Sequence, residues 1–341
     1  MSLNKKFFIG GAAGITATDY FAPVTYTGNG TSSHQITGVG FQPDIVWLKN
    51  RDAAVDHRLF DSIRGSYLLA PNTTNNEALT TQFSSFDSDG FTLGGSASNY
   101  NSLNNDYVAW CWKAGGTAVS NTDGSITSSV SASPESGFSI VQYTAPSGST
   151  TKFTAGHGLS ASPQLVITRR TGGTSNWYTY TEATGSERFL MLNQTNAQSS
   201  TITDFWGTDG MSSTTIGLTN NQACYPSEQH IAYCFHSVEG FSDIGSYTGG
   251  TANQVITTGF KPRFIFIKGI DSATADHWVI YDTVRSPSNP MDELLLPNLS
   301  DAENVNNTNH QISSEDNGFK LITTQTQTNA SGGDYIYLAI K

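Results

Sequence analysis

The chain has 341 residues, a length that corresponds to two or three domains. Charged residues make up only 13% of the chain and hydrophobic residues 37%, so Thr, Ser, Asn and Gly must form much of the surface, as in many secreted or virion β-proteins. A net charge of −11 without any long basic run argues against nucleic acid or an anionic membrane as a partner. No segment approaches the ~20 apolar residues of a membrane helix.

Residues 1–18 form the first segment and contain two lysines followed by Phe7, Phe8 and Ile9. Glycines interrupt this apolar stretch, so it matches a secretory signal peptide poorly. Apolar side chains on a terminal segment need a surface to cover them. We therefore expect a docking arm in which these three side chains contact a partner.

Residues 19–113 predict a first β-sandwich unit, because short alternating strands are separated by frequent turns. Its landmarks are a Tyr-Thr turn, a proline before an apolar strand, an aromatic strand, an Asp-Gly turn and a closing strand. They lie at residues 26–30, Pro43, 57–61, 87–93 and 107–113. Residues 114–137 are rich in Gly, Ser, Thr and Ala, and predict a linker with at most one weak strand.

Residues 138–236 and 237–341 repeat these landmarks in the same order, and predict a second and a third unit. In the second unit they lie at 143–148, Pro163, 177–180, 208–211 and 230–236, and in the third at 247–250, Pro262, 277–282, 315–321 and 335–341. The connection between these two units is short. We therefore expect them to pack as a rigid pair, with the first unit better able to pivot.

The closing strands fix the alignment of the three copies. One face of each carries large apolar side chains: Val108, Trp110 and Trp112; Ile231, Tyr233 and Phe235; Ile336, Leu338 and Ile340. The opposite face is small at its centre, less strictly in the third copy: Ala109 and Cys111; Ala232 and Cys234; Tyr337 and Ala339. A slip of one residue would invert these faces. We predict an all-β fold of three tandem antiparallel β-sandwich units, jelly-roll or lectin-like.

The cysteines, Cys111, Cys224 and Cys234, are odd in number and lack metal-ligand spacing. We expect buried, unpaired thiols in a chain that folds in a reducing compartment. The Asp87–Gly90 run resembles half of a calcium loop but lacks the third ligand and the later glutamate. A hairpin turn is the favoured interpretation, and binding of an ion at these Asp-rich turns stays open.

Catalytic patterns are weak. His57 and His277 occupy the same position of the aligned copies, with Asp61 and Asp282 a few residues later, but the second copy has Trp177 there. A structural pair is therefore favoured over catalysis. No nucleophile elbow, phosphate loop or zinc spacing is present.

Glycoside hydrolysis needs two carboxylates that face each other. Glu182 and Glu187 are plausibly spaced but lie in the most divergent unit. We predict a non-enzymatic protein without cofactor or metal, and keep a glycan-degrading enzyme as the third alternative.

Glycan binding uses flat aromatic faces beside amide and hydroxyl groups. The candidate contact residues are Trp206, Trp177, Trp278 and Tyr225. Trp206 is expected on a loop, whereas core packing is the alternative for aromatic residues on predicted strands.

Several segments together resemble a repeat-domain family of uncharacterised structural, tail-fibre-like proteins from tailed phages and prophages, many from marine and cyanobacterial phages. They are residues 137–144, 156–163, 238–249, 280–285 and 329–337. Residues 41–47 and 107–113 resemble the module that often precedes these repeats. The family brings no established catalytic residues, so the resemblance assigns none.

The resemblance implies a non-enzymatic structural protein on the surface of the virion, most simply a tail- or fibre-associated attachment protein. The alternative is a head-decoration or cement protein of the capsid. The expected partners are other virion proteins, of the tail or the major capsid protein, together with a host-surface glycan. We expect a homo-oligomer in the particle.

Overall fold

The computed structural model describes residues 16–208, 210–272 and 274–341. Within these ranges the regular elements are β-strands, apart from a short 3₁₀ turn, η1 (Ala17–Asp19). All pairings between the named strands are antiparallel. The all-β prediction is confirmed.

Three sheets share one strand order, in which the closing strand of a unit lies between its first and third strands. In the first unit the order is β1 (Phe21–Thr27), β9 (Asp106–Trp112), β3 (Ile45–Asn50) and β4 (Arg58–Asp61). In the second it is β12 (Phe138–Thr144), β18 (Gln229–Phe235), β14 (Leu165–Arg170) and β15 (Tyr178–Thr181). In the third it is β19 (Ser242–Thr248), β25 (Asp334–Ile340), β21 (Phe264–Gly269) and β22 (Val279–Asp282).

A smaller sheet completes each unit. It consists of β2 (His34–Thr37), β8 (Gly90–Leu93) and β7 (Phe83–Asp87) in the first unit, β13 (Lys152–Gly156) and β17 (Thr215–Thr219) in the second, and β20 (Gln254–Thr257), β24 (Gly318–Leu321) and β23 (Ile312–Glu315) in the third. The short strands β5 (Tyr67–Leu68), β6 (Ala78–Leu79) and β16 (Leu190–Met191) lie in the loops that follow β4 and β15. The two sheets of each unit enclose its own apolar core.

The segment predicted to be a linker, residues 114–137, contains two strands. They are β10 (Val119–Asn121) and β11 (Ser128–Ser133), and β11 pairs along its whole length with β12. Most residues of β11 are buried, including Val130 in the apolar core and three serines, so this Ser-rich sequence is an integral part of the sheet. The linker prediction is wrong for these residues, because both strands join the main sheet of the second unit. Together with β16 at the other edge, they give that sheet seven strands.

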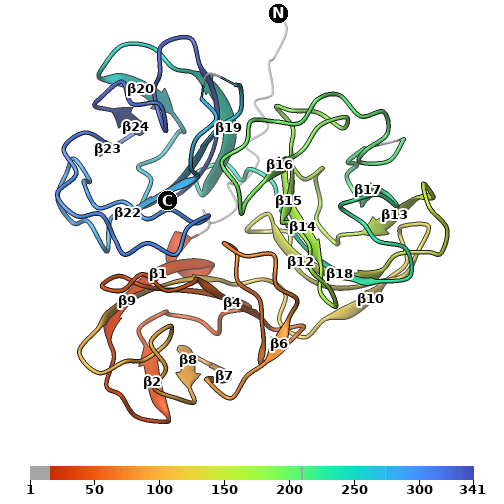
Figure 1. The fold of residues 1–341 in the computed structure, drawn as a ribbon, viewed down its shortest axis with the longest axis horizontal. Coiled ribbons are helices and arrows are strands. Elements are labelled where there is room, and N and C mark those ends of the chain that lie inside the picture. The colour runs from red at the N-terminus through yellow and green to blue at the C-terminus, as the bar shows by residue number, and fades with distance from the viewer. Residues whose placement is uncertain (1–15, 209, 273) are drawn as a thin grey trace, which may run out of the picture.

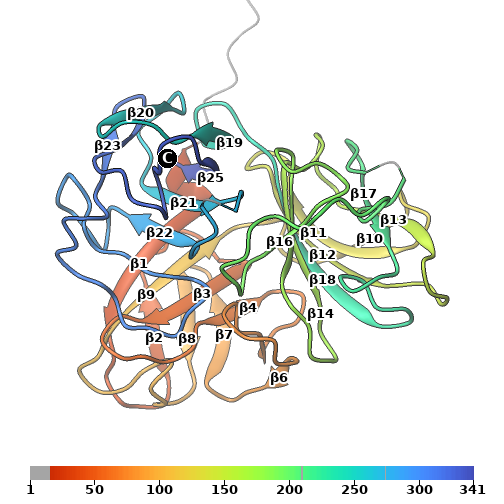
Figure 2. The ribbon, with the colours of Figure 1, turned by 45° about the horizontal axis from the view of Figure 1, so that its top comes forward.

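The three units form three lobes around a common centre (Figures 1 and 2). The large-residue faces of β9, β18 and β25 contribute to one shared apolar cluster at this centre, together with residues of all three units. The small-residue faces, such as Cys111 and Cys234, belong instead to the separate core of each unit. Each main sheet is therefore buried on both faces.

Equivalent main-chain hydrogen bonds link each unit to the next and close the ring. They are the bonds from the N–H groups of Glu77, Gln198 and Glu303 to the carbonyl oxygens of Thr171, Ile270 and Arg51, with N···O distances of 2.9, 2.8 and 2.8 Å. The first unit is thus bound to both neighbours. The expectation that it pivots beside a rigid pair is wrong, because all three units share one core.

Candidate functional site

Two of the three contacts between units contain the same buried ion pair. Asp61 ends β4 and Asp282 ends β22, and each carboxylate accepts hydrogen bonds from the backbone N–H and the side chain of the arginine three residues later. These arginines, Arg64 and Arg285, are also buried. Isolated charges would be very unfavourable at such positions, so each pair depends on both of its members.

An aromatic residue of another unit completes each pair. Tyr233 of the second unit donates its O–H to Asp61 over 2.8 Å, and Trp110 of the first unit donates its indole N–H to Asp282 over 2.9 Å. These two donors occupy the same register position on the closing strands β18 and β9. The ion pairs therefore connect units as well as stabilising the loop after the edge strand.

The third contact departs from this pattern. Thr181 and Thr184 of the second unit stand where the other units have the aspartate and the arginine, and Leu338 of the third unit stands where they have the aromatic donor. The hydroxyl of Thr181 accepts a hydrogen bond from the N–H of Thr184, within its own unit. This contact therefore lacks the arginine, the aspartate and the aromatic donor that the other two contacts share.

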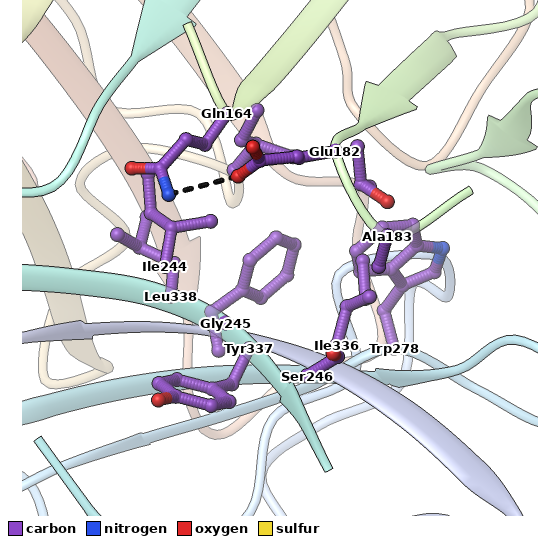
Figure 3. Close-up of a pocket in the computed structure, with 13 residues that line it drawn as sticks. Gln164, Glu182, Ala183, Ile244, Gly245, Ser246, Trp278, Ile336, Tyr337 and Leu338 are labelled. Atoms are coloured by element: carbon purple, nitrogen blue, oxygen red, sulfur yellow. Dashed lines mark hydrogen bonds between the residues drawn. The ribbon is translucent and has the colours of Figure 1, made fainter. Parts of the chain in front are cut away.

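A cavity of about 220 Å³ lies at this third contact (Figure 3). In the second unit its lining comes from β14 and the residue before it, and from β15 and the loop that follows. In the third unit it comes from β19, β21, β25 and the residue before β22. The lining residues are Gln164, Leu165, Thr181, Glu182, Ala183, Ile244, Gly245, Ser246, Phe266, Trp278, Ile336, Tyr337 and Leu338. The cavity is therefore formed jointly by two units.

Smaller side chains explain why space remains at this contact. Leu338 replaces a tryptophan or a tyrosine, and Ala183 stands where the equivalent loops carry Ile63 and Val284. Because protein interiors are otherwise close-packed, the loss of this volume leaves an open space. We regard this cavity as the candidate functional site.

The mouth of the cavity is polar and its inner wall is apolar. Glu182 is exposed and accepts a hydrogen bond from the amide of Gln164 over 3.1 Å, and both residues lie on one side of the cavity, opposite Gly245 and Ser246 (Figure 3). No Lys, Arg or His is among the described residues that line it. The cavity therefore has an apolar wall and, at its mouth, a carboxylate without a basic partner in the lining.

A family model described as a domain of unknown function, DUF7483, matches residues 16–341, nearly the whole chain. The chain belongs to the DUF7483 family. No curated protein matches the sequence.

In this DUF7483 chain a second set of equivalent contacts involves ring N–H groups. The residues before β4, β15 and β22 each reach a backbone carbonyl of the neighbouring unit: His57 to Leu296 over 3.3 Å, Trp177 to Ala70 over 3.0 Å and Trp278 to Met191 over 3.0 Å. His57 is thus equivalent to Trp177 and Trp278. The predicted equivalence of His57 with His277 is wrong by one residue.

The three tryptophans predicted to contact glycans are buried. Trp177, Trp206 and Trp278 expose 0%, 1% and 1% of their surface. Trp206 packs with Phe205 and Tyr180 in the core of the second unit and donates its indole N–H to the carbonyl of Arg188. A sugar has no access to these rings, so the glycan prediction is wrong for all three.

Tyr225, the fourth predicted glycan contact, is only partly buried. The guanidinium carbon of Arg170 lies 3.8 Å from the centre of its ring, which is cation–π geometry. One face of this ring is therefore already covered by an arginine of the same chain. The structure does not bring Tyr225 into the lining of the cavity.

The predicted histidine–aspartate pairs do not form. The ring of His57 accepts a hydrogen bond from the indole N–H of Trp47 over 2.9 Å, while Asp61 binds Arg64. His277 contacts the side-chain amide of Asn298 over 2.8 Å. Both histidines therefore have structural partners other than the predicted carboxylates.

A buried cation occupies one equivalent position in each main sheet. Arg169 of the second unit donates to the carbonyl oxygens of Thr74 and Asn75 in the first unit, and Lys268 of the third donates to the carbonyl of Thr195 in the second. Lys49 is the counterpart in the first unit. Burial lowers the pKa of Lys49 and of Lys268 to about 8 and that of Arg169 to about 10.

His57 and His230 are two of the buried histidines that are held in their neutral form. Each accepts a hydrogen bond on one ring nitrogen: His57 from Trp47, and His230 from the N–H of Tyr225 over 3.0 Å. Burial lowers the pKa of His57 well below 6.5 and that of His230 to about 4. Protonation would direct an N–H toward a group that is itself a donor.

We expect the free energy of unfolding to fall as the pH falls from about 6.5 toward 4. The unfolded chain binds more protons than the folded chain in this interval, because the folded pKa values are the lower ones. His230 alone should account for about 2 kcal/mol between pH 7.5 and pH 5. Urea denaturation at the two pH values measures this difference, and His230→Gln should reduce it. Equal stabilities at both pH values would contradict the assignment.

The Asp-rich turn of the first unit uses its carboxylates for hydrogen bonds within the chain. Asp87 accepts from the hydroxyls of Ser85 and Thr92, and Asp89 accepts from the N–H groups of Gly38 and Gly40. No group of three or more potential metal-binding side chains occurs within the described part of the chain.

The three cysteines are buried and unpaired, as predicted. Burial raises the pKa of the Cys224 thiol to about 12, so the reactive thiolate is disfavoured there.

Phe7, Phe8 and Ile9, the predicted docking arm, lie outside the described residues. Glu187, the second carboxylate considered for glycoside hydrolysis, is not among the described residues that line the cavity. Within the described ranges, no helix has the length and apolar character needed to cross a membrane.

Proposed function

We propose that this chain is a non-enzymatic structural protein on the surface of a tailed-phage particle, associated with the tail or its fibres and taking part in attachment. The sequence resemblance to tail-fibre-like repeat proteins motivates the proposal. The observation that carries it is the closed ring of three units, in which the same position supplies a linking group each time: His57, Trp177 and Trp278.

Such an interior suits a protein whose task is mechanical. Buried charges such as Arg169 and Lys268 are used to connect neighbouring units. A shared core also keeps the three lobes in a constant relative orientation, so loops at their outer ends are presented as one rigid surface. The partners of that surface would be other virion proteins and, on the outer side, a host-surface glycan reached through residues other than the buried tryptophans.

Head decoration is the second candidate, and the arrangement of the units gives it support. Three similar lobes around one centre present three similar outer edges (Figure 1). Such a body matches the symmetry of a threefold position in a protein lattice, where three equivalent neighbours meet. A single chain could then cement a capsid at such positions without contacting a receptor.

Copy number per particle tests these proposals. Quantitative mass spectrometry of purified particles would measure this chain against the major capsid protein. We expect a few to a few dozen copies, which is the stoichiometry of a tail or fibre component. Hundreds of copies would instead favour head decoration, and absence from the purified particles would contradict both roles.

A further inference from the structure

The cavity at the third contact lies where the other two contacts hold a cation and an aromatic ring. At one of them, Arg285 is bound by the carboxylate of Asp282, and its guanidinium carbon lies 5.6 Å from the centre of the Trp110 ring. At the other, Arg64 and Tyr233 both bind Asp61. At the equivalent position of both other contacts, a guanidinium group is thus bound by a carboxylate beside an aromatic ring.

The lining of the cavity retains groups that such an occupant would contact. Leu338 and Ile336 form part of the apolar wall, and Phe266 and Trp278 stack on each other with their ring centres 4.8 Å apart. Glu182 supplies a carboxylate at the mouth. An apolar body would displace water from the wall, and a positive charge would be attracted to the carboxylate.

No basic side chain among the described residues of the lining competes with a ligand for the carboxylate of Glu182. Thr184 replaces the arginine of the other contacts. Gln164 orients the carboxylate of Glu182 by donating its amide N–H, while its amide oxygen accepts the N–H of Ser237 over 2.7 Å. The carboxylate is therefore positioned, and no cation of the lining neutralises it.

We propose that this cavity binds an organic cation: a guanidinium, amidinium or ammonium group on an apolar body of roughly the size of one side chain. The charged group lies at Glu182, and the apolar body lies against Ile336 and Leu338. The cation is either a free small molecule or the side chain of another protein, because both present the same chemistry. The proposal concerns a binding site and does not depend on a virion role.

Benzamidine is a suitable probe, because it joins a planar amidinium to an aromatic ring. Titration of methyl-labelled protein, followed by NMR, reports binding through the methyl groups of Leu165, Ile244, Ile336 and Leu338, which line the cavity. We expect a dissociation constant on the order of 1 mM for so small a ligand. Benzamide, its neutral analogue, should bind at least about fivefold more weakly. Equal affinities, or shifts at methyl groups remote from the cavity, would overturn the proposal.

Two variants test the lining. Glu182→Gln removes the charge at an exposed position and should weaken benzamidine binding about fivefold, whereas the matched variant Glu187→Gln should leave it unchanged. Ala183→Ile introduces the residue that the first unit carries as Ile63, and should abolish binding by filling the mouth. Unchanged binding in either Glu182→Gln or Ala183→Ile would exclude this cavity as the site.

Agmatine and a short peptide with an internal arginine distinguish the two sources of the cation. Binding of agmatine alone supports a free small molecule, since the peptide backbone then does not fit the mouth. Binding of both, with the same dependence on Glu182, supports a side chain of another protein. If neither shifts the cavity methyl groups, the proposed ligand class is wrong.

Discussion

Replacing Arg285 by alanine is expected to lower the free energy of unfolding by about 3–5 kcal/mol. The side chains of Arg285 and Asp282 are completely buried, and that of Glu303 is 2% exposed. Although burial favours the neutral form of Arg285, Asp282 and Glu303 raise its pKa, so it stays cationic. Its removal leaves Asp282 with only neutral hydrogen-bond donors, among them the indole N–H of Trp110. Urea denaturation followed by tryptophan fluorescence measures the loss.

Two control variants separate the buried charge from other causes. The double variant Asp282→Thr, Arg285→Thr copies Thr181 and Thr184 of the second unit, and should lose less stability than Arg285→Ala because no unpaired aspartate remains. Lys152→Ala breaks an ion pair in which the lysine is 45% exposed, and should change stability by no more than about 1 kcal/mol. A loss of similar size in Lys152→Ala and Arg285→Ala would refute the importance of burial.

The strands and the faces of the closing strands could be predicted from the sequence because they follow local periodicity. Trp110 and Trp112 do lie on one face of β9, and Cys111 lies on the other. Periodicity could not show what the face with the large apolar side chains packs against, because alternation identifies two faces without saying what covers each. A signal was nevertheless present: both faces of this strand are apolar, and a sheet that is apolar on both faces must be covered on both sides.

The candidate site was missed because it depends on a difference between copies. The segments Ser-Ile-Arg and Thr-Val-Arg, which end in Arg64 and Arg285, are similar in sequence, but the prediction paired the aspartate before each segment with a histidine. Sequence alone does not show that Asp61 meets Tyr233, which lies in another unit. The informative signal was that two replacements occur in the same contact. Thr184 stands where the other contacts have an arginine, and Leu338 stands where they have the aromatic donor.

The remaining failures concern burial of polar and aromatic residues. Trp206 does lie on a turn outside the strands, as the sequence predicts, yet its ring is enclosed by the core of the second unit. Lys49 and Lys268 are fully buried, which is rare for lysine and is not expected from composition. Backbone carbonyl groups accept their hydrogen bonds, and such acceptors are supplied by tertiary structure, without any signature in the residue types.

Trp177→Ala is expected to destabilise all three units together, by about 3–5 kcal/mol. The indole belongs to the shared central cluster, stacks near Tyr233 and donates its N–H to Ala70 of the first unit. Its removal creates a cavity and leaves the carbonyl of Ala70 without this donor. Because the central cluster includes residues of every unit, the units should unfold in one cooperative transition.

Hydrogen exchange resolved by residue measures whether this coupling exists. In Trp177→Ala, amide protection should decrease in β9 of the first unit and β25 of the third as much as in β18 of the second, since all three strands contribute to the same cluster. If the units were independent, the loss would be confined to the second unit. Trp206→Ala is the matched variant, because its ring contacts only the core of the second unit. If the centre couples the units, that variant should also reduce protection in β9 and β25, since a unit that unfolds uncovers the central faces of the other two.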